Sequence, residues 1–150
     1  MTGKVRSSAM TSQPAPPFAV TVRVYYEDTD AAGIVYYANY LRFMERARSE
    51  WLRARLRGPR ELALTAQVLF AVRSVSLKFL TPARLDDLLT ITAEPVSVRG
   101  ASITLRQACL RGTETVCRGE VDLACVDAQS FAPRRLPEEL NLALGKAPVS

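Results

Sequence analysis

One long helical pattern followed by several strand patterns constrains this chain more than any other feature. Residues 36–58 are rich in helix-favouring side chains. An apolar stripe recurs there at 4-3-4 spacing, through Tyr40, Met44, Ala47 and Trp51. The following segments are typical of strands joined by short turns, which pair antiparallel. A helix on one face of a curled antiparallel sheet of about five strands is an α+β fold.

The strand predictions rest on period-two alternation and on β-branched residues. One face of residues 18–28 carries the apolar side chains Phe18, Val20, Val22 and Val24. Further strands are expected over residues 68–80, 88–99, 102–111 and 115–127. Pro95 interrupts the third of these five strands, so it predicts an edge strand or a bulge there. A short last helix is expected from Pro137.

The long helix has start and stop signals. Asn39 is the expected N-cap, and Gly58-Pro59 is the expected stop. A helix of about twenty residues would be about 30 Å long. Because only sheet is predicted after it, we expect one large helix packed against that sheet.

Length and composition fit a single soluble domain. The chain has 150 residues. We expect a disordered leader over residues 1–17, the domain over residues 18–143 and a flexible tail over residues 144–150. Neither a secretory signal nor a transmembrane segment is recognisable. The three cysteines, Cys109, Cys117 and Cys125, are expected to be buried, reduced thiols, which indicates a cytoplasmic protein.

Histidine is absent from the chain. This excludes Ser-His and Cys-His nucleophile pairs, His general bases and His-ligated zinc. Catalysis would have to use carboxylates, Lys, Tyr, thiols or the backbone. The net charge of +5 can simply aid solubility, but it also suits a polyanionic ligand such as nucleic acid or a phosphate-bearing molecule.

Three acids, Glu27, Asp28 and Asp30, precede the long helix within four residues. One interpretation is a capping loop, because a helix N-terminus favours anions. The other is that one acid performs chemistry there. A metal site is poorly supported, since no third ligand is evident beside Asp28 and Asp30. We expect Glu27 and Asp28 to be loop or capping acids.

The stretch "YYEDTDAAGIVYYANYLRFMERAR" resembles the signature of the 4-hydroxybenzoyl-CoA thioesterase-like family of hotdog proteins. It is most similar to the branch of Tol-Pal-associated acyl-CoA thioesterases. A second stretch, "LKFLTPARLDDLLTI", also resembles a segment of that family. The resemblance covers roughly residues 20–127.

The resemblance implies a hotdog protomer, dimers with a continuous sheet that often pair into tetramers, and active sites at the dimer interface. It implies that Asp30 is the catalytic carboxylate and that the backbone N–H of Tyr37 donates to the oxyanion. Many members of the Tol-Pal-associated branch have histidine at the position of Tyr37, so any role of that imidazole is absent or altered here. Gly33 would let the backbone turn tightly and approach the substrate.

Thioester hydrolysis is compatible with the lack of histidine, because a thiolate departs with little help from a general acid. It still needs a carboxylate that attacks the carbonyl carbon or activates water. It also needs a donor for the developing oxyanion, and a loop entering a helix can supply both.

The predicted substrate is therefore an acyl-CoA, with no separate cofactor and no metal. Tyr36 is a candidate wall of the acyl site, although aromatic core is an equal alternative for it. The candidate contacts to the phosphates of CoA are Arg73, Lys78, Arg84 and Arg99. The acyl length and the choice between direct attack and water activation stay open.

Three alternatives remain beside the thioesterase. A hotdog hydro-lyase usually requires histidine. A non-catalytic partner would bind acyl thioesters or an acyl carrier protein, and an acyl carrier protein is also a candidate partner of the enzyme. A nucleic-acid binder is suggested by "RARLRGPR", but this segment lacks interleaved aromatic residues, so no nucleic acid is expected.

Overall fold

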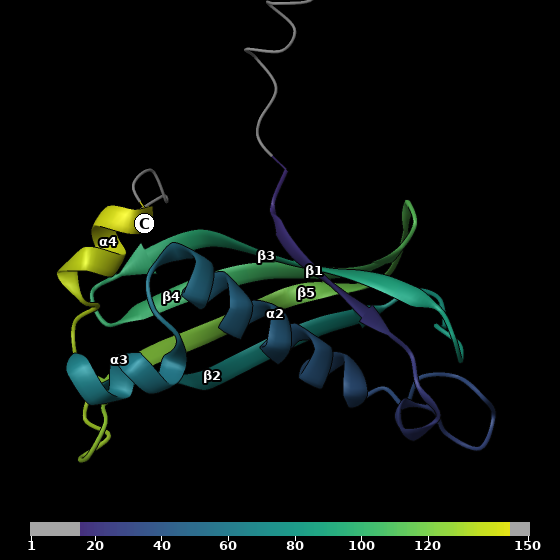
Figure 1. Cartoon of the computed structure of the whole chain (residues 1–150), viewed down its shortest axis with the longest axis horizontal. Helices are drawn as coiled ribbons and strands as arrows, with labels where there is room; N and C mark the ends of the chain where they lie inside the picture. Colours follow the sequence, from purple (N-terminus) through teal and green to yellow (C-terminus); the bar gives the residue numbers. More distant parts are fainter. Residues whose placement is uncertain (1–15, 145–150) are drawn as a thin grey trace, which may run out of the picture.

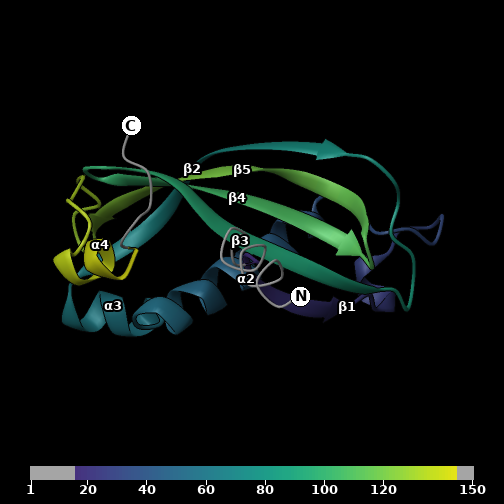
Figure 2. The ribbon, with the colours of Figure 1, turned by 90° about the horizontal axis from the view of Figure 1, so that it is seen from above.

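The computed structural model describes residues 16–144 and has one helix lying along a curved five-stranded sheet (Figure 1). The strands are β1 (Phe18–Arg23), β2 (Val68–Phe79), β3 (Leu88–Arg99), β4 (Ser102–Arg111) and β5 (Glu114–Asp127). The helices are η1 (Tyr26–Asp28), α2 (Asn39–Arg55), α3 (Pro59–Thr65) and α4 (Glu138–Leu144). All strand pairs are antiparallel, in the order β1-β3-β4-β5-β2. Figure 2 shows the sheet arching over α2.

The core lies between α2 and the concave face of the sheet. The buried side chains of α2 are Tyr40, Phe43, Met44, Ala47, Trp51 and Leu52, which confirms the predicted stripe. They face buried residues of the strands such as Ile91, Ile103 and Leu105. Burying one such side chain stabilises the fold by about 1.5–3 kcal/mol. This apolar contact fixes the helix on the sheet.

One polar side chain is fully buried in this apolar layer. Gln107 on β4 donates from Nε2 to the carbonyl oxygens of Met44 and Thr92, both at 3.0 Å. Its Oε1 accepts a hydrogen bond from Arg48 at 3.0 Å. A buried amide is stable only when it is hydrogen-bonded, so Gln107 joins the middle of α2 to the sheet.

Two predictions about the long helix are wrong. Asn39 is the first helical residue and not the N-cap, because its side-chain amide donates to the carbonyl oxygen of Asp28 at 2.9 Å. The helix has 17 residues and ends at Arg55, before the expected stop, but sheet does not follow it directly, because Pro59 begins the separate helix α3. Proline suits the first turn of a helix because its missing N–H needs no partner there.

The strand predictions hold with two refinements. The first strand ends at Arg23, earlier than expected, because Tyr26–Asp28 forms a short 3-10 helix. The pairing of β3 with β4 shifts between Pro95 and Ser97, which confirms the bulge expected from Pro95. Because β3 lies between β1 and β4, it is not an edge strand. The short helix expected after Pro137 is α4.

Several predictions concern the ends and the thiols. Most of the expected leader and tail lies outside the described residues, so the domain boundaries stay predictions. The three cysteines are buried and free, as expected. Within residues 16–144, no helix is both long and apolar enough to cross a membrane.

Candidate active site

The acidic loop begins with a carboxylate that holds the backbone. Asp28 is 9% exposed, and its Oδ2 accepts a hydrogen bond from the N–H of Tyr25 at 2.9 Å. Its carbonyl oxygen accepts two more, from the N–H of Tyr36 at 3.0 Å and from the side chain of Asn39 at 2.9 Å. Asp28 therefore fixes both ends of the loop that leads into α2, in line with its expected capping role.

Asp30 differs from Asp28 because its side chain is exposed to solvent. Its Oδ1 accepts the N–H of Ala32 at 2.9 Å, and its carbonyl oxygen accepts the N–H of Gly33 at 2.9 Å. Gly33 has a φ of +81°, a conformation that side-chain-bearing residues rarely adopt. The glycine thus closes a tight turn, and one carboxylate oxygen of Asp30 has no protein donor among the described residues.

A second segment, residues 81–87, supports this turn from the side. The N–H of Val35 donates to the carbonyl oxygen of Ala83 at 2.8 Å, and Ile34 pairs with Arg84 in an isolated bridge. Asp87 holds the segment itself, since its Oδ2 accepts the N–H of Arg84 at 2.8 Å. The loop therefore rests on the strand-to-strand connection between β2 and β3, far away in sequence.

The backbone amide of Tyr37 lies at the entrance to α2. Asn39 and Tyr40 donate their N–H groups to the carbonyl oxygens of Tyr36 and Tyr37. In the part of the chain that the structure describes, the N–H of Tyr37 itself has no acceptor. An unpaired N–H at a helix N-terminus is suited to bind an anion, because the helix dipole adds to its partial positive charge.

A cluster of aromatic rings surrounds the start of α2, next to this amide. The ring centroids of Tyr36 and Tyr37 lie 5.0 Å apart, and Phe79 meets Tyr37 edge-on at 6.1 Å. Tyr40 lies behind them, where its hydroxyl oxygen accepts the N–H of Ala83 at 3.2 Å. Burial raises the pKa of Tyr40, so this phenol stays protonated. Tyr36 and Tyr37 are 48% and 61% exposed, which places them at the surface rather than in the core.

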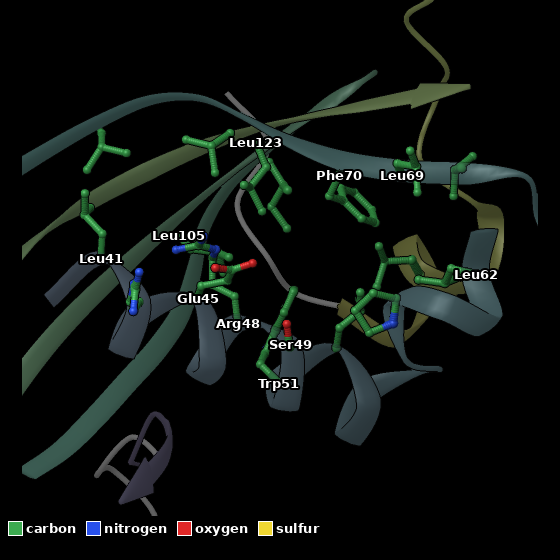
Figure 3. Close-up of a pocket in the computed structure, with 18 residues that line it drawn as sticks. Leu41, Glu45, Arg48, Ser49, Trp51, Leu62, Leu69, Phe70, Leu105 and Leu123 are labelled. Atoms are coloured by element: carbon green, nitrogen blue, oxygen red, sulfur yellow. The ribbon is translucent and has the colours of Figure 1, made fainter. Parts of the chain in front are cut away.

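A cavity of about 470 Å³ runs along α2 from Leu41 to Leu52 (Figure 3). Most of its lining is apolar and comes from α2, α3 and β2, with further side chains from β4, β5 and α4. Figure 3 shows Glu45 and Arg48 projecting from α2 toward the strands, with Phe70 and Leu123 on the opposite side. Concave, largely apolar cavities of this size are typical of sites for small ligands.

A second cavity, of about 490 Å³, lies between β1 and α2 and has a more polar lining that includes Arg46 and Glu50. Asp30 lines neither cavity. No group of three His, Cys, Asp or Glu side chains that could hold a metal ion is gathered among residues 16–144. The chain thus presents Asp30 and Tyr37 at its surface, outside both cavities.

The four basic candidates are not gathered at one place. Arg84 lies next to the Asp30 loop, and Lys78 directly precedes Phe79 at the end of β2. Arg73 lies further back on β2, in an ion pair with Asp122 at 2.8 Å. Arg99 ends β3, whereas the first residue of that strand follows the 81–87 segment, so Arg99 lies about 36 Å away at the usual rise per residue. Of these four candidates, Arg84 and Lys78 are the two at the end of the molecule that carries Asp30.

Sequence reasoning missed two parts of this region. Phe79 was not singled out, although it ends a segment that the family resemblance covers. Arg48 and the cavity around it were also missed, because a charged residue on a helix usually marks the solvent face. No sequence signal shows that the partner of Arg48 is a glutamine hidden in an apolar strand.

Comparisons with known proteins identify the family of this chain. Residues 32–118 match the family model described as the thioesterase superfamily. An acyl-CoA thioesterase YbgC of Haemophilus influenzae is 41% identical over 84% of this chain and 93% of its own length. An acyl-CoA thioester hydrolase YbgC of Escherichia coli is 43% identical over 82% of this chain and 92% of its own.

A solved structure leads to the same family. A probable thioesterase from Bartonella henselae has 36% sequence identity and a TM-score of 0.78, covering 81% of this chain and 100% of that one. The predicted hotdog fold and the predicted thioester-hydrolysing enzyme are thereby confirmed. The family match spans more than half of the sequence, and the chain therefore belongs to the thioesterase superfamily.

Proposed function

We propose that this protein hydrolyses acyl-CoA to a free carboxylic acid and CoA, with Asp30 and the Tyr37 amide as the reacting groups. The observation that carries the proposal is the pairing of a solvent-exposed carboxylate with an unpaired N–H at a helix start, on one hydrogen-bonded loop. The names of the relatives from H. influenzae and E. coli support an acyl-CoA substrate.

In this proposal the thioester carbonyl oxygen accepts a hydrogen bond from the N–H of Tyr37. Asp30 then attacks the carbonyl carbon or takes a proton from an attacking water. Negative charge develops on the carbonyl oxygen, where the amide and the dipole of α2 stabilise it. The C–S bond breaks, CoA leaves as a thiolate that takes up a proton, and one water is consumed per turnover. No separate cofactor or metal is required.

The acyl group is proposed to extend past Tyr36 and Tyr37 into the apolar cavity beside α2. The cavity begins at Leu41, one turn beyond Tyr37, so it continues in the direction of the helix. Arg84 and Lys78 are the candidates that remain for the phosphates of CoA in the same protomer. Arg73 and Arg99 can serve only if another subunit brings them to the site.

We further propose that the working unit is a dimer, itself paired into a tetramer, in the cytoplasm. Strand β2 ends one side of the sheet, and its apolar residues Val72, Val75 and Phe79 are 50%, 40% and 49% exposed. An open edge with exposed apolar side chains favours pairing with a second copy. A second subunit on this edge would also cover the exposed Asp30 region. An acyl carrier protein remains a candidate partner.

The activity is tested with a panel of acyl-CoAs and the Asp30→Asn variant. We expect the wild-type protein to release free CoA and the variant to lose at least ~10²-fold in turnover, the lower end for loss of a general base. Glu27→Gln is the matched control, because it removes one exposed carboxylate three residues away. Near-normal turnover of a folded Asp30→Asn protein would show that Asp30 is not the catalytic group.

The assembly is tested by light scattering at micromolar concentration. We expect a mass of two or four chains. A monodisperse monomer that still hydrolyses acyl-CoA would contradict the proposed interfacial site while leaving the activity itself intact.

A further inference from the structure

Arg48 occupies an unusual environment for a charged side chain. It lines the apolar cavity together with residues such as Leu105 and Leu123. Burial lowers the pKa of its guanidinium, an effect that nearby Glu45 opposes. Arg48 is half-buried, and a cation that has lost part of its water is unfavourable unless it gains a polar or charged partner.

The structure holds this guanidinium in place without a salt bridge to it among the described residues. Its one hydrogen bond to a side chain of the described residues goes to Oε1 of Gln107, a neutral and fully buried group that is itself fixed by two backbone carbonyls. Among the ion pairs of residues 16–144, none includes Arg48. The remaining N–H groups of Arg48 are therefore free to bind an acceptor inside the cavity.

A second unpaired donor lines the same cavity. Trp51 is 3% exposed, and its indole Nε1 is buried without an acceptor in the described part of the chain. The indole N–H can only donate, and buried donors nearly always find a partner. The cavity is also cationic, since Arg42 and Arg48 outnumber its one acid, Glu45.

We propose that this cavity selects acyl groups that end in a carboxylate, which Arg48 binds at the end remote from the thioester. A planar guanidinium binds a carboxylate through two parallel, charge-assisted hydrogen bonds. The carboxylate also balances the excess positive charge. An acyl group with an apolar end does neither, because it covers Arg48 and leaves it unpaired.

The position of Arg48 on α2 sets the length of such an acyl group. Arg48 is nine residues beyond Asn39, which is about 14 Å along a helix axis. The chain between the thioester and the carboxylate must therefore contain several methylene groups. The inferred substrates are CoA monothioesters of medium-length dicarboxylic acids. This inference rests on the proposed thioesterase function.

The test compares octanoyl-CoA with the CoA monothioester of octanedioic acid, which has the same chain length. We expect the wild-type protein to prefer the dicarboxylic substrate in kcat/KM. Arg48→Met, which keeps much of the side-chain volume, should lower that preference by about 10- to 100-fold, the range for a lost hydrogen bond to a charged group. Trp51→Phe should lower the preference less.

Arg46→Met is the matched control, because Arg46 lines the other cavity and lies over the ring of Phe43 at 5.9 Å. This change should leave the ratio unaltered. If wild type hydrolyses octanoyl-CoA without favouring the dicarboxylic substrate, the inference is wrong and the proposed function stands. If the wild-type protein hydrolyses neither substrate and no other acyl-CoA, the proposed thioesterase function itself is contradicted.

The variants also separate substrate binding from a structural role. If Arg48→Met slows both substrates equally, or changes the mass measured by light scattering, Arg48 supports the fold or an interface and the inference is overturned. Binding of the dicarboxylic substrate to the inactive Asp30→Asn protein gives an independent readout. Calorimetry should show tighter binding than for octanoyl-CoA, and this difference should disappear when Arg48→Met is added.

Discussion

The acidic loop has two halves that carry the same chemical group and use it differently. In the first half, the carboxylate of Asp28 is buried and accepts a backbone N–H, while its carbonyl oxygen accepts two further donors. In the second half, Asp30 is exposed on a turn closed by Gly33, and the Tyr37 amide is unpaired. The two aspartates are separated by a single residue.

This difference assigns a structural role to Asp28 and a proposed catalytic role to Asp30. Each carboxylate accepts one backbone N–H, but that of Asp28 is buried and its hydrogen bond stabilises the loop. An exposed carboxylate contributes little to stability and keeps a free oxygen for a substrate. Substitutions in the first half should therefore change stability, and substitutions in the second half should change turnover.

The largest expected effect is on turnover, from Tyr37→Pro. Proline removes the N–H proposed to bind the oxyanion, and loss of one such donor typically lowers kcat by about 10²–10³-fold. Because this N–H bonds no other described group, the fold does not lose a hydrogen bond. Circular dichroism must first show a native helix content. A folded variant with full activity would place the oxyanion donor elsewhere.

Asp28→Ala should affect stability instead. The change leaves the N–H of Tyr25 without its acceptor, which lowers the free energy of unfolding by about 1–3 kcal/mol. Urea unfolding measures this loss, and Glu27→Ala, at an exposed site in the same 3-10 helix, should show almost none. If Asp28→Ala abolishes turnover at full stability, the division between the two halves is wrong.

Gly33→Ala tests the turn between the halves. An added Cβ would meet no atom within 4 Å, so only the positive φ opposes the change, at about 1–2 kcal/mol. Gly100 also has a positive φ and open space around it, in the β3–β4 hairpin. Gly100→Ala should lower stability by a similar amount without slowing hydrolysis. Gly33→Ala should lower stability and also slow hydrolysis. Equal turnover in the two variants would argue against a catalytic role of the turn.

The smallest effect is expected from Tyr37→Phe. This variant keeps the amide and the ring that meets Phe79, and removes only the hydroxyl. Steady-state kinetics should show most of the activity retained. If instead it is as inactive as Asp30→Asn, the phenol donates a proton and the backbone amide is not the essential group.

The fold could be predicted largely because its signals are local. The stripe on α2 and the alternation in β1 each lie within one segment, and Pro95 marks its own bulge. The helix α3 was missed because Gly58-Pro59 is a stop signal in the sequence, whereas here α2 has already ended at Arg55 and Pro59 begins a new helix. Asn39 failed as an N-cap because its amide finds an acceptor eleven residues earlier, which no local rule predicts.

In the candidate site, too, the residues of one local motif could be predicted and the residues distant in sequence could not. Asp30, Gly33, Tyr36 and Tyr37 follow one another in a short motif, so the resemblance could identify them together. For basic residues on the strands, the sequence could not show which lie near Asp30. Arg99 is an example, since it lies at the end of β3 remote from the Asp30 loop. Whether Asp30 acts as proposed depends on the kinetic experiments above.

The buried amide of Gln107 has a consequence for motion. Its hydrogen bonds to the carbonyl oxygen of Met44 and to Arg48 attach the middle of α2 to β4, while the carbonyl oxygen of Thr92 on β3 fixes the amide itself. Sliding or rotating the helix would break several buried hydrogen bonds at once, which makes such a motion slow and rare. We therefore expect α2 to keep its position on the sheet when substrate binds, so that any adjustment falls on the exposed loop before the helix.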